Sequence, residues 1–71
     1  MPPPPPISNS IRALREAHGG MTQGDLGDRI GMTRQTVAAI EQGRYSPSLE
    51  AAFRIAQVFG VPLSDVFRWE G

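Results

Sequence analysis

The chain has 71 residues without a cysteine, and its seven basic side chains, all arginine, balance seven acidic ones. This length allows one small domain in which every helix contributes to a shared core, and the lack of cysteine excludes disulfides and thiolate metal sites. No apolar run approaches the length of a membrane span and no signal peptide is recognisable, so a soluble, cytoplasmic protein is expected.

A run of five prolines, residues 2–6, follows Met1. Such a run cannot form a helix and favours an extended polyproline II rod. We interpret residues 1–7 as a proline-rich tail that acts as a solvated spacer, and a ligand for a polyproline-binding partner is the alternative. The folded domain is expected over residues 8–69.

A first helix is predicted over residues 8–17, because Ile7, Ile11 and Leu14 recur at the spacing of one helical face after candidate cap residues. His18, the only histidine, follows this helix. A metal ligand or a pH switch would need partners that the sequence lacks, so we interpret His18 as a solvated residue of the last turn.

Residues 21–44 contain two helix-start signals. Thr22 and Thr33 each follow a methionine, and each threonine oxygen can accept from the free amides of a first helical turn. The predicted helices cover residues 23–30 and 34–42, and Gly31 and Gly43 end them as residues that tolerate a left-handed conformation. Two short helices joined by a glycine-containing turn form the helix-turn-helix pattern.

The outward side of the second of these helices is predicted to read DNA. Val37 and Ile40 occupy one side, and the opposite side carries Gln35, Ala38, Ala39 and Gln42, with Arg34 on its flank. A side with so few long charged residues can lie close to another surface, and the major groove, about 12 Å wide, admits one helix. By donor and acceptor geometry Arg34 suits guanine and Gln35 suits adenine, while Ala38 or Ala39 can contact a thymine methyl group.

The sequence resembles the XRE family, the phage-repressor and Cro type of helix-turn-helix, over about residues 8–69. The resemblance is specific because the turn, the recognition helix and the following helix appear in the family's order and spacing. It rests on Thr22-Gln23, Leu26, Gly31, residues 33–37, residues 40–44, residues 47–49 and residues 60–62. It implies an all-α, compact five-helix domain like that of lambda repressor, which binds operator DNA.

Further roles are implied by this resemblance. Family members have an arginine near the position of Arg15 that reaches a glutamate at the end of the recognition helix, here Glu41, so a structural ion pair is expected. A small residue usually stands at the place of Gly27, where the two helices of the motif cross. The residues at positions that contact the DNA backbone are Thr22, Gln23, Thr33, Gln42 and Arg44.

Two more helices are predicted towards the C-terminal end. Ser48 is the expected cap of a helix that ends at Gly60, with an apolar stripe of core residues: Leu49, Ala52, Phe53, Ala56 and Phe59. Leu63, Val66 and Phe67 then indicate a short fifth helix. Trp69 and Phe67 form either a lid on the core or half of a two-fold contact, and family members often dimerise near this end.

The sequence therefore predicts sequence-specific binding of double-stranded DNA by a transcriptional repressor, and a homodimer through the C-terminal region is one expected assembly. It carries no nucleotide-binding or nucleophile motif, and Asp25 and Asp28 are read as solvated first-turn acids, so no enzyme activity, cofactor, metal or small-molecule effector is expected. The alternative is a protein-interaction module or antitoxin-like partner-binding domain of the same fold. Zero net charge favours this alternative, since it weakens long-range attraction to DNA.

Overall fold

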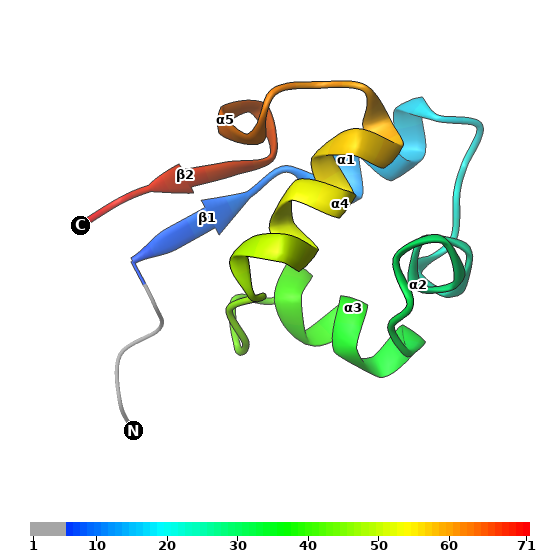
Figure 1. Cartoon of the computed structure of the whole chain (residues 1–71), viewed down its shortest axis with the longest axis horizontal. Coiled ribbons are helices and arrows are strands. Elements are labelled where there is room, and N and C mark those ends of the chain that lie inside the picture. Colours follow the sequence, from blue (N-terminus) through cyan, green and yellow to red (C-terminus); the bar gives the residue numbers. More distant parts are fainter. Residues whose placement is uncertain (1–5) are drawn as a thin grey trace.

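The computed structural model describes residues 6–71, and this part of the chain forms five helices and a two-stranded sheet (Figure 1). The five predicted helices are confirmed, but the sheet makes the all-α assignment only approximate. Most of the expected proline-rich tail, residues 1–5, lies outside the described residues. The elements in chain order are β1 (Ile7–Asn9), α1 (Ile11–Ala17), α2 (Gln23–Ile30), α3 (Arg34–Glu41), α4 (Leu49–Phe59), α5 (Leu63–Val66) and β2 (Phe67–Trp69).

The sheet joins the two ends of the described chain. β1 and β2 are antiparallel, with Ile7 opposite Trp69 and Asn9 opposite Phe67. The predicted first turn of the first helix, residues 8–10, was therefore wrong, and Ile7 belongs to the fold rather than to the tail. Phe67 likewise lies in β2 and not in the fifth helix, because the backbone amides and carbonyls at both ends satisfy one another across the sheet.

The helix boundaries of the motif follow from local hydrogen bonds. Thr22 Oγ1 accepts from the Asp25 backbone N–H at 2.9 Å, and the Asp25 carboxylate accepts from the Thr22 N–H at 3.1 Å, which together form a capping box. Thr33 Oγ1 accepts from the Thr36 N–H at 3.1 Å. α2 is followed by Gly31 at φ 75°, in the left-handed region. α3 is one residue shorter than predicted, because Gln42 is its C-cap.

The core lies between the helices and is lined by side chains from α1 to α5. The predicted buried stripe of α4 was partly wrong, since Leu49 and Phe53 are 68% and 55% exposed. The buried face of this helix is rotated towards Ala51 and Ile55, and it includes Phe59. Within residues 6–71, no helix has both the length and the hydrophobicity that a membrane span requires.

Candidate nucleic-acid interface

The two helices of the motif cross at Gly27, which is buried. A Cβ atom at this position would lie 2.5 Å from the Met32 carbonyl oxygen, so a side chain would push the turn away from α2. The Met32 N–H also donates to the Gly27 carbonyl at 2.9 Å. Gly24 differs, because the nearest neighbour of a Cβ atom added there would be Thr22 Oγ1 at 3.7 Å, an ordinary van der Waals contact. The close packing expected at Gly27 is thus confirmed, and Gly24 has no such constraint.

An ion pair joins α1 to the end of α3. Arg15 Nε donates to Glu41 Oε2 at 2.8 Å and Arg15 Nη2 donates to Glu41 Oε1 at 3.0 Å, so the pair is bidentate. Arg15 Nη1 also donates to the Met21 carbonyl at 2.7 Å, just before α2. The two side chains are only 13% and 8% exposed. The hydrogen bonds to Glu41 raise the pKa of the Arg15 guanidinium, and the pair fixes α3 relative to α1 and α2.

The outward side of α3 is accessible. Val37 and Ile40 are buried in the core, whereas Arg34 and Gln35 at the N-terminal end of the helix are exposed. Ala38 and Ala39 are half-buried and project little beyond the backbone. Figure 1 shows α3 at one edge of the fold, with its N-terminal end on the side away from the sheet. This side therefore combines donors and acceptors at one end with a low surface behind them, which allows close approach to a flat or grooved partner.

The five candidate backbone-contact residues lie at the N-termini of α2 and α3 and after the end of α3, and they differ in environment. The hydroxyls of Thr22 and Thr33 serve as helix caps, so their first role is to set the N-termini of α2 and α3. Gln23 and Gln42 line one polar hollow, whose other walls are formed by Asn9, Arg12, Arg15, Glu16 and Glu41. Arg44 is exposed in the loop after α3.

Two residues near α3 were missed by sequence reasoning. The Asn9 side-chain amide donates to the Ile40 carbonyl at 3.0 Å, which ties the end of α3 to β1, and no sequence signal could have revealed this long-range contact. Tyr45 is 50% exposed and lines a hollow with Gln35, Thr36 and Ala39. An isolated aromatic residue just after the glycine that ends the recognition helix was the signal that could have identified it.

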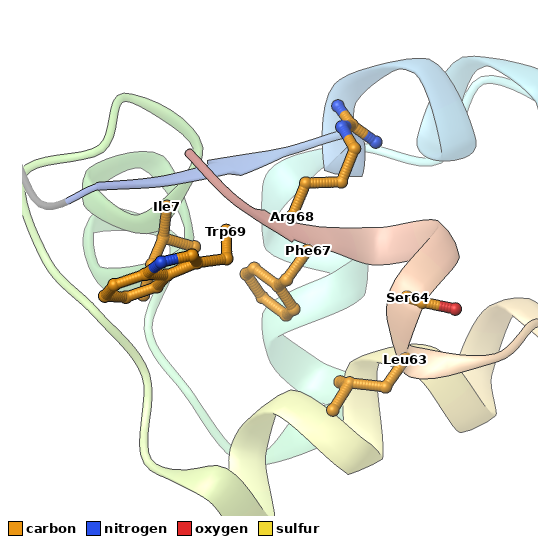
Figure 2. Close-up of a pocket in the computed structure, with 6 residues that line it drawn as sticks. All are labelled: Ile7, Leu63, Ser64, Phe67, Arg68 and Trp69. Carbon is orange, nitrogen blue, oxygen red and sulfur yellow. The ribbon is translucent and has the colours of Figure 1, made fainter. Parts of the chain in front are cut away.

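A second, apolar hollow lies at the sheet, and its lining residues come from β1, α5 and β2. Figure 2 shows Ile7, Trp69, Phe67 and Leu63 directed into it, while Arg68 points to the other side of the strands. Phe67 is half-buried and packs against the core, but Trp69 is 71% exposed. Phe67 thus acts as a lid on the core, and Trp69 adds an accessible aromatic surface.

Comparison with known proteins gives several similarities. A family model described as helix-turn-helix matches residues 11–66. The HTH-type transcriptional regulator MJ0272 of Methanocaldococcus jannaschii is 45% identical over 64 residues, which cover 90% of this chain and 96% of the relative. The regulator YgzD of Bacillus subtilis is 48% identical over 61 residues, which cover 86% and 91% respectively. The cryptic phage CTXphi transcriptional repressor RstR of Vibrio cholerae is 34% identical over 60 residues, 84% of this chain and 53% of the repressor.

A solved structure shares the fold. A Bacteroides fragilis protein described as DNA-binding superposes with a TM-score of 0.75, covering 87% of this chain and 98% of its own, at 19% identity. The family match begins where α1 begins and stops where α5 stops, so it includes the complete helical domain. The threonine caps, the glycine crossing and the accessible side of α3 described above lie within this match. The chain therefore belongs to the XRE-type helix-turn-helix family.

Proposed function

We propose that this domain recognises a specific sequence in duplex DNA with α3 in the major groove, and that it represses transcription there. DNA-binding transcription regulation is the activity of its family, and the relatives from M. jannaschii and B. subtilis are named as regulators. Repression is the finer step, which the name of the RstR relative supports. The observation that carries the proposal is the exposed, low outward side of α3 with Arg34 and Gln35 at its N-terminal end.

In this proposal the base readers are the four residues on that side. The Arg34 guanidinium donates two hydrogen bonds to guanine O6 and N7, and the Gln35 amide pairs with adenine N6 and N7. Ala38 and Ala39 are short enough to let the helix axis approach the bases, and their methyl groups contact thymine. The Arg15–Glu41 ion pair acts indirectly, since it holds α3 at the angle at which these side chains reach the groove.

The backbone contacts are assigned to Thr22, Gln23, Thr33, Gln42 and Arg44. The first turns of α2 and α3 present unpaired amide N–H groups and the positive end of the helix dipole, which attract phosphate. The threonine hydroxyls accept from these turns, and the neighbouring Gln23 supplies an amide donor. Arg44 supplies a charge in the loop after α3. These contacts position the domain without reading the sequence.

The division between readers and backbone contacts can be tested with two arginine variants. Arg34→Ala should lose about 1 to 3 kcal/mol on the selected sequence and little on random duplex, because its contact is to a base. Arg44→Ala should weaken both duplexes alike and reduce the slope of log affinity against log salt by about 1. Affinities measured by fluorescence anisotropy at two salt concentrations give both quantities. Equal losses on specific and random duplex for both variants would contradict the assignment.

The same titration separates DNA binding from the alternative, a protein-interaction or antitoxin-like module. Release of counterions makes DNA affinity fall steeply as salt rises, whereas an apolar protein contact responds weakly. The alternative is favoured by the zero net charge alone. A chain that binds no duplex selectively at low salt would support it and would overturn our proposal.

The proposal includes a homodimer that forms through the C-terminal region. Trp69 is 71% exposed and lines the apolar hollow together with Ile7, Leu63 and Phe67. Its ring offers an apolar surface for a second copy of the chain to cover. Two copies related by a two-fold axis would place two α3 helices on a symmetric operator. Sedimentation equilibrium should show weaker association for Trp69→Ser, while Phe53→Ser, at an exposed aromatic on α4, serves as the matched control. If Phe53→Ser loses the dimer and Trp69→Ser keeps it, the dimer contact lies on α4 and not at the C-terminal region.

A regulator of this kind works where the DNA is, so the proposal also assigns the protein to the cytoplasm. It invokes no metal, cofactor or small-molecule effector.

A further inference from the structure

A hollow on the outward side of α3 has mostly hydrocarbon walls. It is open and shallow, and it is lined by Gln35, Thr36, Ala39 and Tyr45. The Ala39 methyl group, the Thr36 methyl group, the Gln35 stem and the Tyr45 ring are the apolar parts of these four residues. The hollow exists because Ala39 is short, so that the space beyond its methyl group is left free between longer neighbours.

Tyr45 is held beside α3 by the backbone turn that ends this helix. The Gly43 N–H donates to the Ile40 carbonyl at 3.1 Å, and the Arg44 N–H donates to the Ala39 carbonyl at 2.9 Å. Gly43 has φ 73°, the left-handed conformation that lets the chain reverse at a helix end. The chain therefore returns alongside the last turn of α3, and Tyr45, which is 50% exposed, lines the same hollow as Ala39.

We propose that Gln35, Thr36, Ala39 and Tyr45 form a pocket for the 5-methyl group of a pyrimidine, and that Tyr45 is a specificity-determining residue. This inference rests on the proposed function, because it assumes that this side of α3 enters the major groove. The floor of that groove presents hydrogen-bond donors and acceptors, and the thymine 5-methyl group is its one apolar projection. 5-Methylcytosine carries the same group at the same ring position. An apolar hollow between Gln35 and Tyr45 is suited to this apolar group.

The test compares duplexes that differ only by a methyl group. A sequence is first selected from a random duplex pool with the wild-type chain, and each thymine is then replaced singly by uracil and each cytosine by 5-methylcytosine. Burial of one methyl group predicts that the wild type binds the methylated form roughly fourfold more tightly at one position. Tyr45→Ala should reduce this ratio to about one, since the hollow loses its aromatic wall, whereas Tyr45→Phe keeps the ring and the ratio.

A second variant tests the pocket from its floor. Ala39→Val fills the hollow with two more carbon atoms, so the methylated form should lose its advantage even if Tyr45→Ala folds poorly. Arg44→Ala, which changes a backbone contact, should weaken methylated and unmethylated duplexes equally. Circular dichroism establishes that each variant is folded.

The possible outcomes separate the inference from the proposed function. If the wild type selects no sequence, the proposed function fails. If it selects a sequence but binds methylated and unmethylated forms equally at every position, the methyl pocket and the thymine contacts assigned to Ala38 and Ala39 are overturned, while sequence-specific DNA binding stands. A methyl preference that survives both Tyr45→Ala and Ala39→Val would also overturn it. A response to thymine alone or to 5-methylcytosine as well identifies the natural source of the methyl group.

Discussion

The crossing of α2 and α3 predicts opposite effects for the same substitution at two glycines of one helix. In Gly24→Ala the new methyl group meets its nearest neighbour, Thr22 Oγ1, at 3.7 Å, so only the helix propensity changes. Alanine is favoured over glycine inside a helix by about 1 kcal/mol, and we expect Gly24→Ala to stabilise the domain by roughly 0.5 to 1 kcal/mol.

In Gly27→Ala the methyl group would lie 2.5 Å from the Met32 carbonyl oxygen, which is backbone and cannot rotate away. α2 and the turn before α3 must move apart. This weakens the hydrogen bond that the Met32 N–H donates to the Gly27 carbonyl, and it loosens the packing of the core. Overpacking lowers the free energy of unfolding by about 1 to 3 kcal/mol, and we expect a value near the upper end because the clash is with a backbone atom. After subtraction of the propensity gain of about 1 kcal/mol, a net loss of about 2 kcal/mol remains.

The assay is thermal and urea unfolding followed by circular dichroism. For a domain of this size 1 kcal/mol corresponds to roughly 4 to 8 °C in Tm, so Gly27→Ala should melt roughly 8 to 16 °C below the wild type and Gly24→Ala above it. The two variants share helix, residue type and substitution, so Gly24→Ala controls for propensity. Equal melting temperatures for the two would refute the steric account of the crossing.

Three further predictions concern other contacts. Glu41→Gln leaves the Arg15 guanidinium buried without its counter-charge, so urea unfolding should show a loss of about 3 kcal/mol. The pKa of Asp25 is lowered chiefly because the Thr22 backbone N–H donates to its carboxylate. The ionised carboxylate therefore stabilises the fold fully above its ordinary pKa, and this stabilisation is lost as the pH falls through the lowered pKa. Asp25→Asn lacks this carboxylate, so it should lose less stability than the wild type on acidification below about pH 4. Phe53→Ala should cost less than about 1 kcal/mol, because this ring is largely exposed, whereas a buried phenylalanine costs about 3 to 5 kcal/mol.

The features that the sequence predicted correctly depend on residues close together in the chain. The caps at Thr22, Thr33 and Ser48 are bonds from a side chain to a backbone amide three residues on. The stops at Gly31 and Gly60 reflect a left-handed backbone conformation at a single residue. Such signals do not depend on the rest of the fold, and the helix boundaries of the motif followed from them.

The errors concern features set by distant segments. β1 has three residues and no periodicity, and it is a strand because β2, at the other end of the chain, pairs with it. The buried face of α4 is chosen by the elements that pack on it, so the apolar residues Leu49 and Phe53 could be assigned to the core although they are exposed. Tyr45 lies beside Ala39 only because the turn at Gly43 reverses the chain.

The zero net charge does not make the α3 side neutral. Three of the seven arginines are held in ion pairs with acidic residues of the fold: Arg12 with Glu16, Arg15 with Glu41, and Arg54 with Glu50. Arg34 and Arg44, at the two ends of α3, form no ion pair within residues 6–71, the part of the chain that the structure describes. Their charges are therefore available to DNA, while the paired carboxylates act mainly within the fold. Net charge governs steering from a distance, but these local charges govern the contacts made after arrival. The neutrality that favours a protein partner is thus compatible with a DNA-binding surface at α3.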